Sequence, residues 1–416
     1  MILLALYVAL FIASMVAVGF ATRNRKPRDF TALKTVTFGD ETAVRPNRAA
    51  SIISVVVIFL LWGAFTGSRW APIHVPGAFT GESSFTYTAQ DAGGATDDAM
   101  VTFIVHEVGA DVEAPQIPEG DGFAKNDAGL IGAYRSELFR VTRNDGEGVE
   151  VVAVEGQPIA PGQTVQVERA SVTMTPRGSL NVAPATGLQM ESIWLPAPEE
   201  VVAAFIEIAS DGYQNFTLAE HLGWSLIRVL VGFAIGAAVG IPLGYAMGLS
   251  GWFRGWFDPI VEFMRPVPPL ALIPLVIIWF GIWETGKIVL LFLAALWIMA
   301  IAARAGVSGV NITKVHAAYS LGASKWQILR HVIIPNSLPE IFTGARVAMG
   351  VCWGTVVAAE LVAAQKGAGM MIIAASKFQQ TYIVLMGIIL IGLIGYGIDI
   401  LMRKAENWLV PWKGRS

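Results

Sequence analysis

The sequence predicts a mainly α-helical, polytopic membrane protein of about seven transmembrane helices with an inserted extracytoplasmic β-sandwich domain. Of the 416 residues, 54% are apolar and only 15% are charged, whereas ordinary globular domains hold about 25% charged residues. The apolar residues gather in long runs on both sides of one polar stretch, residues 67–194. Most of the chain is therefore predicted to lie in lipid, and no basic block indicates nucleic-acid binding.

Two apolar runs precede the polar stretch. Residues 2–20 and 50–66 each have roughly the length that a helix needs to cross about 30 Å of hydrocarbon. The linker between them, 21–48, holds seven basic residues against three acidic ones. The basic residues are Arg23, Arg25, Lys26, Arg28, Lys34, Arg45 and Arg48. By the positive-inside rule this linker is cytoplasmic and the N-terminus lies outside.

The polar stretch has the pattern of a small β domain. Residues 67–198 contain 17 acidic and 7 basic residues. Apolar and polar side chains alternate in 84–89, 99–105, 149–154 and 164–176, as in half-buried strands. Glycine- and proline-rich turn signals separate these runs, at 92–94, 144–148, 160–163 and 176–179.

The same stretch resembles bacterial cadherin-like and immunoglobulin-like adhesion repeats in a permuted order. Residues 79–105 are similar to the closing half of such a repeat, and 139–187 to its opening half. The resemblance implies one domain formed from both halves, with 106–138 as a connecting loop. The calcium-ligand run of these repeats is weak here, and the five histidines are scattered without metal-ligand spacing, so we predict no bound metal.

The membrane pattern resumes in residues 195–416. A short interfacial helix is predicted at 195–209, because a proline opens it and acidic residues fill its first turn. Spans are predicted at 223–248, 267–283, 286–304, 342–364 and 382–402. Counted from the outer domain, this order places the loop 305–341 and the C-terminus in the cytoplasm. The basic residues of the loop and of the tail agree with that side: Arg304, Lys314, Lys325, Arg330, Arg346, Arg403, Lys404, Lys413 and Arg415.

The loop 305–341, between the spans 286–304 and 342–364, has the pattern of two short helices joined by a hinge. Gly322 permits a sharp turn, and Ser324 with Gln327 forms an S-x-x-Q capping box that begins a new helix. Trp326 lies on the apolar stripe of that helix, and Pro335 is predicted to end it. Periodicity alone also allows a helix pair that only caps the bundle at the membrane surface.

The loop resembles the EAA motif of ABC importer permeases, a pattern of Glu-Ala-Ala, three residues, Gly, nine residues and Ile-x-Leu-Pro. In this sequence the pattern falls on His316, Ala317, Ala318, Gly322 and the run ending in Pro335, with His in place of the family's Glu. Further stretches, 240–288, 357–364 and 411–414, resemble the taurine and alkanesulfonate branch of that family. The likeness covers about residues 195–416; the first span and the polar domain have no counterpart in the usual member.

The resemblance implies a permease that docks ATPase subunits on this loop. The implied coupling residues are His316, Ala317, Ala318, Gly322, Ala323, Ser324, Lys325, Trp326 and Pro335. The implied partners are a second permease copy, two ATP-binding cassette subunits, a periplasmic substrate-binding protein and membrane lipid. The chain itself contains no G-x-x-x-x-G-K-[ST] loop. We therefore expect no cofactor in this chain and no enzyme activity of its own, with ATP and Mg²⁺ held by the partner ATPase.

The candidate residues of a translocation pathway are Arg265, Pro268, Pro269, Trp353 and Glu360. Four prolines within 266–274 preclude a regular helix and indicate a kinked, pore-lining segment; a purely structural kink is the alternative. Glu360 lies in an apolar span, where an acid indicates a functional site. It is a poor ligand for an anionic sulfonate, so we expect it to pair with an arginine or to serve a gate; exposure at the helix end is the alternative.

Three other features of the C-terminal half bear on the architecture. Arg228 and Arg346 also lie within spans, where they are predicted either to balance a bound anion or to extend toward the interface. Residues 366–380 are too short and polar-flanked to span, which indicates a re-entrant or interfacial segment. Gly232, Gly236 and Gly240 have the spacing of a close helix–helix contact.

Two functions from different classes fit these features. The first is the permease subunit of an ATP-driven importer for a small sulfonate, with taurine favoured. The second is a self-sufficient secondary transporter or channel with an external sensor domain. Paired broken helices in inverted repeats would favour the second, and the sequence has only one proline-broken segment. For the polar domain we favour docking or assembly with the binding protein over a spacer or dimer contact.

Overall fold

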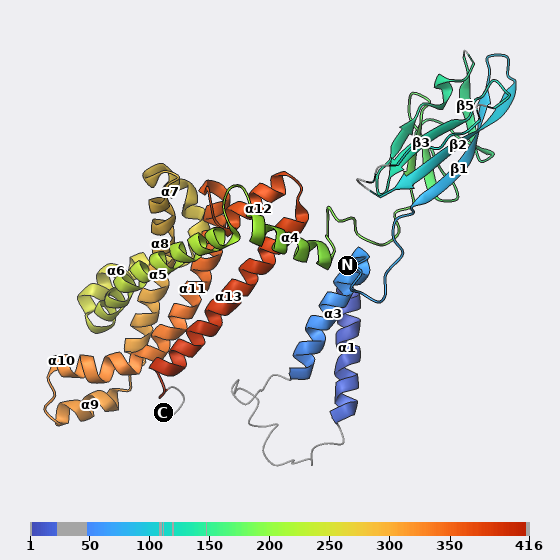
Figure 1. The fold of residues 1–416 in the computed structure, drawn as a ribbon. Helices are drawn as coiled ribbons and strands as arrows, with labels where there is room; N and C mark the ends of the chain where they lie inside the picture. Colours follow the sequence, from blue (N-terminus) through green and yellow to red (C-terminus); the bar gives the residue numbers. More distant parts are fainter. Residues whose placement is uncertain are drawn as a thin grey trace. The chain divides into compact units, whose positions relative to one another are not determined.

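The structure is a computed structural model that describes residues 2–22, 48–107, 110, 112–118, 120–146 and 148–412. The chain divides into two compact units, residues 1–199 and 200–416, and each is described by itself (Figure 1). The predicted basic linker falls outside the described residues between positions 23 and 47, as do Lys413 and Arg415 of the tail.

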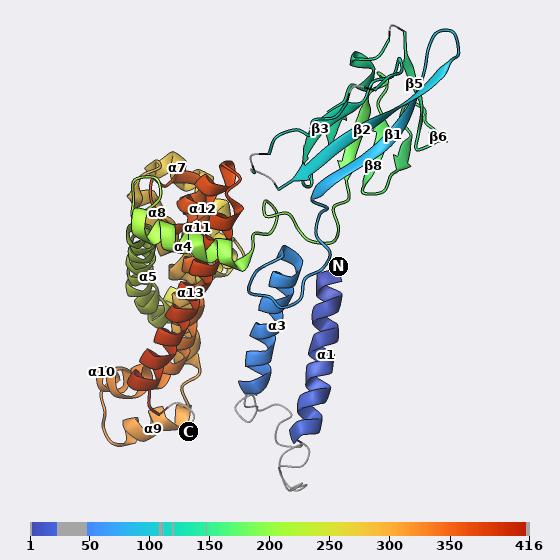
Figure 2. The ribbon, with the colours of Figure 1, turned by 45° about the vertical axis from the view of Figure 1, so that its right-hand side comes forward.

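The first unit begins with two apolar helices that correspond to the predicted runs 2–20 and 50–66. Helix α1 covers Ile2–Thr22 and α3 covers Arg48–Thr66. They pack side by side, as both views show (Figure 2), and a hydrogen bond of 2.9 Å joins the Tyr7 hydroxyl to the Ser54 hydroxyl.

Among the described residues, nine strands follow α3 and form two sheets. The strands are β1 (Gly81–Gln90), β2 (Thr96–His106), β3 (Asp127–Gly132), β4 (Glu137–Phe139), β5 (Glu150–Val154), β6 (Gln157–Pro158), β7 (Thr164–Gln166), β8 (Ala170–Met174) and β9 (Leu180–Pro184). One sheet has the order β3-β2-β1-β5-β6 and the other β4-β9-β8-β7. Alternate residues of both sheets, such as Phe85, Val101 and Val172, are buried in one shared hydrophobic core.

Two sequence predictions for this region are wrong in detail. The expected connecting loop 106–138 contributes β3 and β4, and β3 pairs in parallel with β2. The expected strand 164–176 is two strands, because the chain turns between them with a hydrogen bond from the Val167 amide to the Ala170 carbonyl. The turn at 92–94 forms as predicted, since the Asp91 carboxylate accepts hydrogen bonds from the amides of Gly93 and Ala95.

The second unit is helical throughout. Its elements are α4 (Pro198–Asp211, which begins at the boundary), α5 (Leu218–Leu249), α6 (Gly251–Met264), the 3₁₀ turn η3 (Pro269–Leu272), α7 (Ile273–Phe280), α8 (Glu284–Ser308), α9 (Ile312–Ser320), α10 (Lys325–Ile328), the π-helical turn η4 (Leu329–Ile333), α11 (Ile334–Ala363), α12 (Ala368–Lys377) and α13 (Thr381–Leu409). Helices α5, α8 and α11 bury one core against the inner face of α13. The protein is thus mainly helical, as predicted.

The membrane-crossing helices differ from the predicted seven spans at two places, α1 and the proline-rich region. Among the described residues, five helical runs are long and apolar enough to span: α3, α5, α8, α10–α11 and α13. A sixth is obtained if α6 and α7, which bend by 92° at the prolines between them, count as one span. A shorter apolar stretch, Ala5–Ala17, lies in α1. The span predicted at 267–283 is part of a bent pair that begins at Gly251. The kink predicted from its prolines is confirmed, because Pro268 and Pro269 cannot supply helical amide hydrogens.

The predicted small-residue contact lies between α5 and α8. A side chain added at Gly232 would meet Leu291 at 2.4 Å, one at Gly236 would meet Ala295 at 2.6 Å, and one at Gly240 would meet the Leu296 carbonyl at 2.6 Å. The glycines let the two backbones approach closely, which explains why α5 and α8 form the central pair of the unit.

Candidate functional site

The loop between α8 and α11 forms the predicted hinged pair of helices. The Asn311 side chain caps α9, and Gly322 then takes a left-handed conformation, with φ of 79°. Ser324 and Gln327 make the capping box that starts α10: the Ser324 hydroxyl accepts from the Gln327 amide at 3.3 Å, and the Gln327 side chain accepts from the Ser324 amide at 2.8 Å. The hydrogen bonds of the Asn311 cap and of the Ser324–Gln327 capping box therefore give the loop a defined shape.

The surface of this loop is unusually apolar. Leu321 is 88% exposed, Trp326 is 66% exposed and Tyr319 is 50% exposed. A hollow of about 350 Å³ lies between α9 and α10 and is lined by Ala318, Leu321, Gly322, Ala323, Gln327, Ile328, His331 and Val332. The expected coupling residues His316, Ala317, Lys325 and Ser324 are exposed on the same helix pair. The loop therefore offers bulky apolar side chains around a hollow.

Pro335 does not end α10, which corrects the prediction. The chain passes from α10 through the π-helical turn into α11, and Pro335 occupies the first turn of α11. A proline is tolerated there because the amide hydrogens of a first turn have no helical acceptor. The carbonyl of Pro335 accepts a hydrogen bond of 3.2 Å from Trp412 Nε1. The loop is thus rigidly continuous with α11 and lies at the same end of the bundle as the C-terminal residues (Figure 1).

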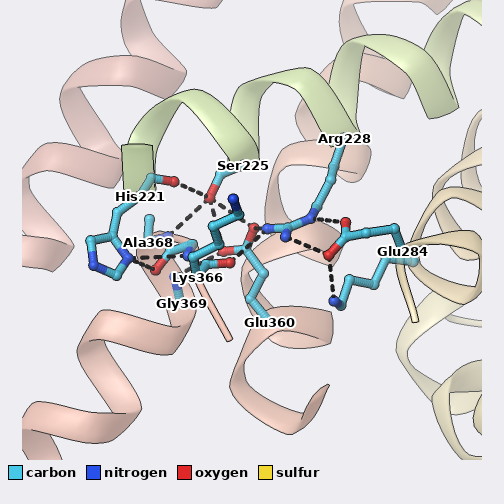
Figure 3. Close-up of polar contacts among 10 residues, drawn as sticks. His221, Ser225, Arg228, Glu284, Glu360, Lys366, Ala368 and Gly369 are labelled. Carbon is cyan, nitrogen blue, oxygen red and sulfur yellow. Dashed lines mark hydrogen bonds and ion pairs between the residues drawn. The ribbon is translucent and has the colours of Figure 1, made fainter. Parts of the chain in front are cut away.

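A buried ionic network lies at the opposite end, where α5, α8, α11 and α12 meet (Figure 3). The side chain of Arg228 on α5 is 1% exposed and reaches two carboxylates. Its Nε donates to Glu284 at 2.6 Å, and its Nη1 donates to Glu360 at 2.7 Å. Lys287 adds a third contact, at 2.9 Å from Glu284. Arg228, Lys287 and Glu360 are buried, whereas the Glu284 side chain is 45% exposed. The two cations and two carboxylates compensate each other's charge, which permits the burial of the first three.

Glu360 also holds the segment that leads into α12. Its carboxylate accepts from the Ser225 hydroxyl at 2.8 Å and from the Gly369 amide at 3.0 Å. Gly367 has a φ of 145°, and a side chain there would meet the Glu360 carboxyl carbon at 2.4 Å. Only glycine fits at this position, for both conformational and steric reasons. The prediction that Glu360 pairs with an arginine is confirmed, and its exposure at the helix end is excluded.

The same network extends to the start of α5. His221 is fully buried, with Nδ1 3.1 Å from the Gly367 carbonyl and Nε2 3.0 Å from the Tyr213 carbonyl. The Lys366 ammonium lies 4.1 Å from the centroid of the Trp224 ring, and the Lys366 carbonyl accepts from Arg228 Nη1 at 2.9 Å. Figure 3 shows these groups converging between α5 and the α12 segment. We conclude that the network fixes the predicted re-entrant segment to the spans.

The candidate pathway residues do not meet at one site. Trp353 lies on the side of α11 that faces α13, where its Nε1 donates to the Ile391 carbonyl at 3.0 Å, whereas Glu360 faces α5. Arg265 ends α6, is exposed, and lies 3.7 Å from Glu262. Pro268 and Pro269 form the break before α7, and the turn that Pro269 begins packs against α8 and α11.

A second ionic cluster lies between α11 and α13. Arg346 contacts Asp399, with its Nε 3.6 Å from Oδ1, and it also pairs with Glu406. Arg403 pairs with the other oxygen of Asp399 at 2.6 Å. Of the two roles predicted for Arg228 and Arg346, extension toward the interface is wrong for Arg228, which is buried, and Arg346 is held by acids of α13. The other role, to balance a bound anion, stays a prediction.

Sequence reasoning missed the acidic partners of both arginines. Glu284, Asp399 and Glu406 lie in or at the ends of apolar helices, so the rule that singled out Glu360 applied to them as well. The sequence does not single out His221 or Ser225. Each is one polar residue within a helix, and neither belongs to a spaced motif that would indicate a buried network.

Comparison with known proteins decides the family. Residues 236–410 match the model of the "Binding-protein-dependent transport system inner membrane component" family. The chain is 46% identical over 231 residues, 55% of its length, to the taurine transport system permease protein TauC of Escherichia coli, and these residues cover 84% of that relative. It is 40% identical over 218 residues, 52% of its length, to the putative aliphatic sulfonates transport permease protein SsuC of Escherichia coli, of which 81% is covered.

The chain belongs to this family of ABC importer permeases, in its taurine and alkanesulfonate group. A permease of this family is an inner-membrane, multi-pass protein and not an enzyme; ATP hydrolysis belongs to separate subunits. Among solved structures, the permease resembles one chain of the MetNI methionine ABC transporter, with 21% identity and a TM-score of 0.38 over 45% of this chain and 95% of that one. With this TM-score the structural likeness carries no weight in the family assignment.

Proposed function

We propose that the protein is the permease subunit of an ATP-driven importer that moves taurine from the periplasm to the cytoplasm. Separate ATPase subunits would dock on the 316–335 loop and drive the transport. The observation that carries this proposal is the loop itself, a hinged helix pair between α8 and α11 that exposes large apolar side chains, above all Leu321 and Trp326. Large exposed apolar side chains around a hollow are typical of a protein-docking site.

The connections of the loop support a coupling role. It follows α8 directly and continues into α11 without a flexible joint, and α8 and α11 are core helices of the second unit. A displacement imposed on α10 would therefore move α11 as a rigid body. The capping box and the Gly322 turn preserve the shape of the docking surface while it moves. His316 stands in place of the family's Glu, so we assign the contact to shape and apolar area rather than to an acid at that position.

The charge distribution supports an orientation. The end of the second unit with the loop carries Lys314, Lys325, Arg330, Arg403 and Lys404, which supports a cytoplasmic position for it. On this assignment the N-terminus is outside and residues 67–194 form an extracytoplasmic β-sandwich. Residues 1–66 then supply two additional transmembrane helices, and 195–416 form the permease core.

The substrate proposal depends on the relatives. One relative is named for taurine transport and another for aliphatic sulfonates, and both classes carry a sulfonate group. The greater identity to the taurine permease favours taurine. We propose a complex of two permease copies, two ATP-binding cassette subunits and a periplasmic substrate-binding protein that docks on the β-sandwich.

Co-purification of the ATPase subunit with the permease tests the docking site. Trp326→Ala should remove most of the co-purified ATPase, because a central buried tryptophan in an interface is worth about 2 kcal/mol or more. Trp194→Ala is the matched control, since that tryptophan is 79% exposed and belongs to the other unit. Equal recovery of the ATPase with both variants would rule out docking on this loop.

A further inference from the structure

A cavity of about 120 Å³ lies between α11 and α13, which run side by side in both views (Figures 1 and 2). Its wall combines an ion pair, Arg346 and Asp399, with the indole of Trp353. Gly350 and Gly395 leave the space open: a side chain added at Gly395 would lie 3.1 Å from the Trp353 ring. The cavity is well below the roughly 300–1,000 Å³ of drug-sized pockets, so it fits only a molecule of a few heavy atoms.

The charged side chains of the cavity are partly exposed, and Arg346 is not fully hydrogen-bonded. The side chain of Arg346 is 33% exposed and that of Asp399 is 27% exposed. Arg346 Nε is buried and has no hydrogen-bond partner among the described residues, because the 3.6 Å to Asp399 Oδ1 is too long for a hydrogen bond. The Arg346 guanidinium is thus partly exposed and not fully hydrogen-bonded, and it lies beside a partly exposed carboxylate.

The formal charge of the cluster is zero. Arg346 and Arg403 are balanced by Asp399 and Glu406 through three ion pairs along α11 and α13. In apolar surroundings a net charge is costly, so a neutral cluster best accepts a ligand whose own charges cancel. An anion alone would add an uncompensated charge, whereas a zwitterion would not.

We propose that this cavity is a transit site for a small zwitterion with a sulfonate at one end and an ammonium group at the other. The sulfonate contacts the Arg346 guanidinium, which matches planar or tetrahedral oxyanions with paired donors. The ammonium group contacts the Asp399 carboxylate and lies against the Trp353 indole, which attracts cations. This inference rests on the proposed import of taurine, and it adds that the permease itself prefers aminosulfonates over simple alkanesulfonates.

The test measures equilibrium binding of labelled taurine to the purified permease–ATPase complex in lipid nanodiscs, without the binding protein, so that only the permease can select. Unlabelled taurine should displace the label at least about tenfold more effectively than ethanesulfonate, which lacks the ammonium group. Asp399→Asn should weaken taurine binding about tenfold and leave ethanesulfonate unchanged or improved. Asp258→Asn is the matched control, because that acid pairs with Arg304 and does not line the cavity.

Two further variants keep the test decisive if Asp399→Asn folds poorly. Gly395→Ala fills the cavity without changing its charge and should weaken both ligands alike, and Trp353→Phe should weaken taurine more than ethanesulfonate. Equal binding of both ligands by the native complex, or no displaceable taurine at millimolar concentration, would overturn the proposal. Taurine-stimulated ATPase activity of the native complex with its binding protein is measured in parallel. If that activity is present while the selectivity is absent, only the transit site fails; if it is absent, the import function fails.

Discussion

Arg228 on α5 and Glu360 on α11 form an ion pair of 2.7 Å in which both side chains are almost completely inaccessible. The pair is one part of a network that includes Glu284 of α8 and the segment before α12. Each charge has a partner of opposite sign, and the remaining lone pairs of Glu360 are taken by Ser225 and Gly369. The network therefore joins four elements that are distant in the sequence.

Removing the positive charge from this pair should destabilise the protein strongly. Arg228→Met leaves Glu360 buried without a counter-charge, which typically costs about 3–5 kcal/mol. We expect a large drop in the midpoint of thermal unfolding, measured by fluorescence-detected size exclusion in detergent. Arg254→Met is the control, because that side chain is 64% exposed and its contact with Asp258 is 3.8 Å. A similar midpoint for the two variants would show that the network is not required for stability.

The left-handed turn at Gly322 should be required for coupling and not for folding. An added side chain at Gly322 would meet no heavy atom within 4 Å among the described residues, so Gly322→Val introduces backbone strain without a clash. The helix pair should then lose its angle, and ATP hydrolysis should continue without taurine uptake in proteoliposomes.

Gly255→Val is the matched control for this experiment. Gly255 lies in α6, it is equally free of neighbours among the described residues, and its φ is not positive. The control should transport normally. Undiminished uptake by Gly322→Val would exclude a role for the turn.

The contact between α5 and α8 should not tolerate larger residues. Gly236→Val places carbon atoms where Ala295 Cβ and the Phe292 carbonyl already lie, at 2.6 and 2.9 Å from the first added atom. Overpacking of this kind costs about 1–3 kcal/mol, so the yield of monodisperse protein and its thermal midpoint should fall. Gly223→Val, on the same helix but with no described neighbour within 4 Å, should behave like the native protein.

The β domain should become less stable as pH rises. Burial, and then the charge of Asp145, raises the pKa of Asp127 from 3.8 to about 7, and burial also raises the pKa of Asp145. The folded state thus binds more protons than the unfolded state between about pH 4 and pH 7, so the free energy of unfolding falls across this window.

Hydrogen exchange of the β1 and β2 amides in the full-length protein measures this pH dependence. Protection should be greatest near pH 4–5 and should decline toward pH 7, after correction for the intrinsic exchange rate. Asp127→Asn removes the titrating group, and its protection should vary less with pH. An unchanged pH profile in that variant would contradict the assignment to Asp127.

The sequence predicted those features that depend on local pattern. Apolar runs located α5, α8 and α13, and the spacing of Ser324 and Gln327 predicted the cap of α10. The pairing of Glu360 with an arginine could also be predicted, because an acid within a span needs a partner of opposite charge. Each of these predictions depends either on residues within one helix or on the energetic cost of an unpaired charge in a span.

The features that were missed depend on contacts between distant segments. The prolines predict a kink, but hydropathy measures composition and not direction. It could not show that the bent segment begins at Gly251 or that the bend reaches 92°. The parallel pairing of β3 with β2 and the acids that hold Arg346 arise from tertiary packing. The sequence pattern also predicts a helix end at Pro335, although a proline is equally suited to the first turn of a helix, where it lies.

We propose that this permease transports taurine only when ATPase subunits drive it through the 316–335 loop. Uptake of labelled taurine into proteoliposomes tests this most directly, with the permease reconstituted together with the ATPase and the binding protein. The account predicts uptake that requires ATP, that stops when the ATPase is omitted, and that is lost in Trp326→Ala. Taurine accumulation by the permease alone, without ATPase or ATP, would instead identify a self-sufficient transporter and contradict the account.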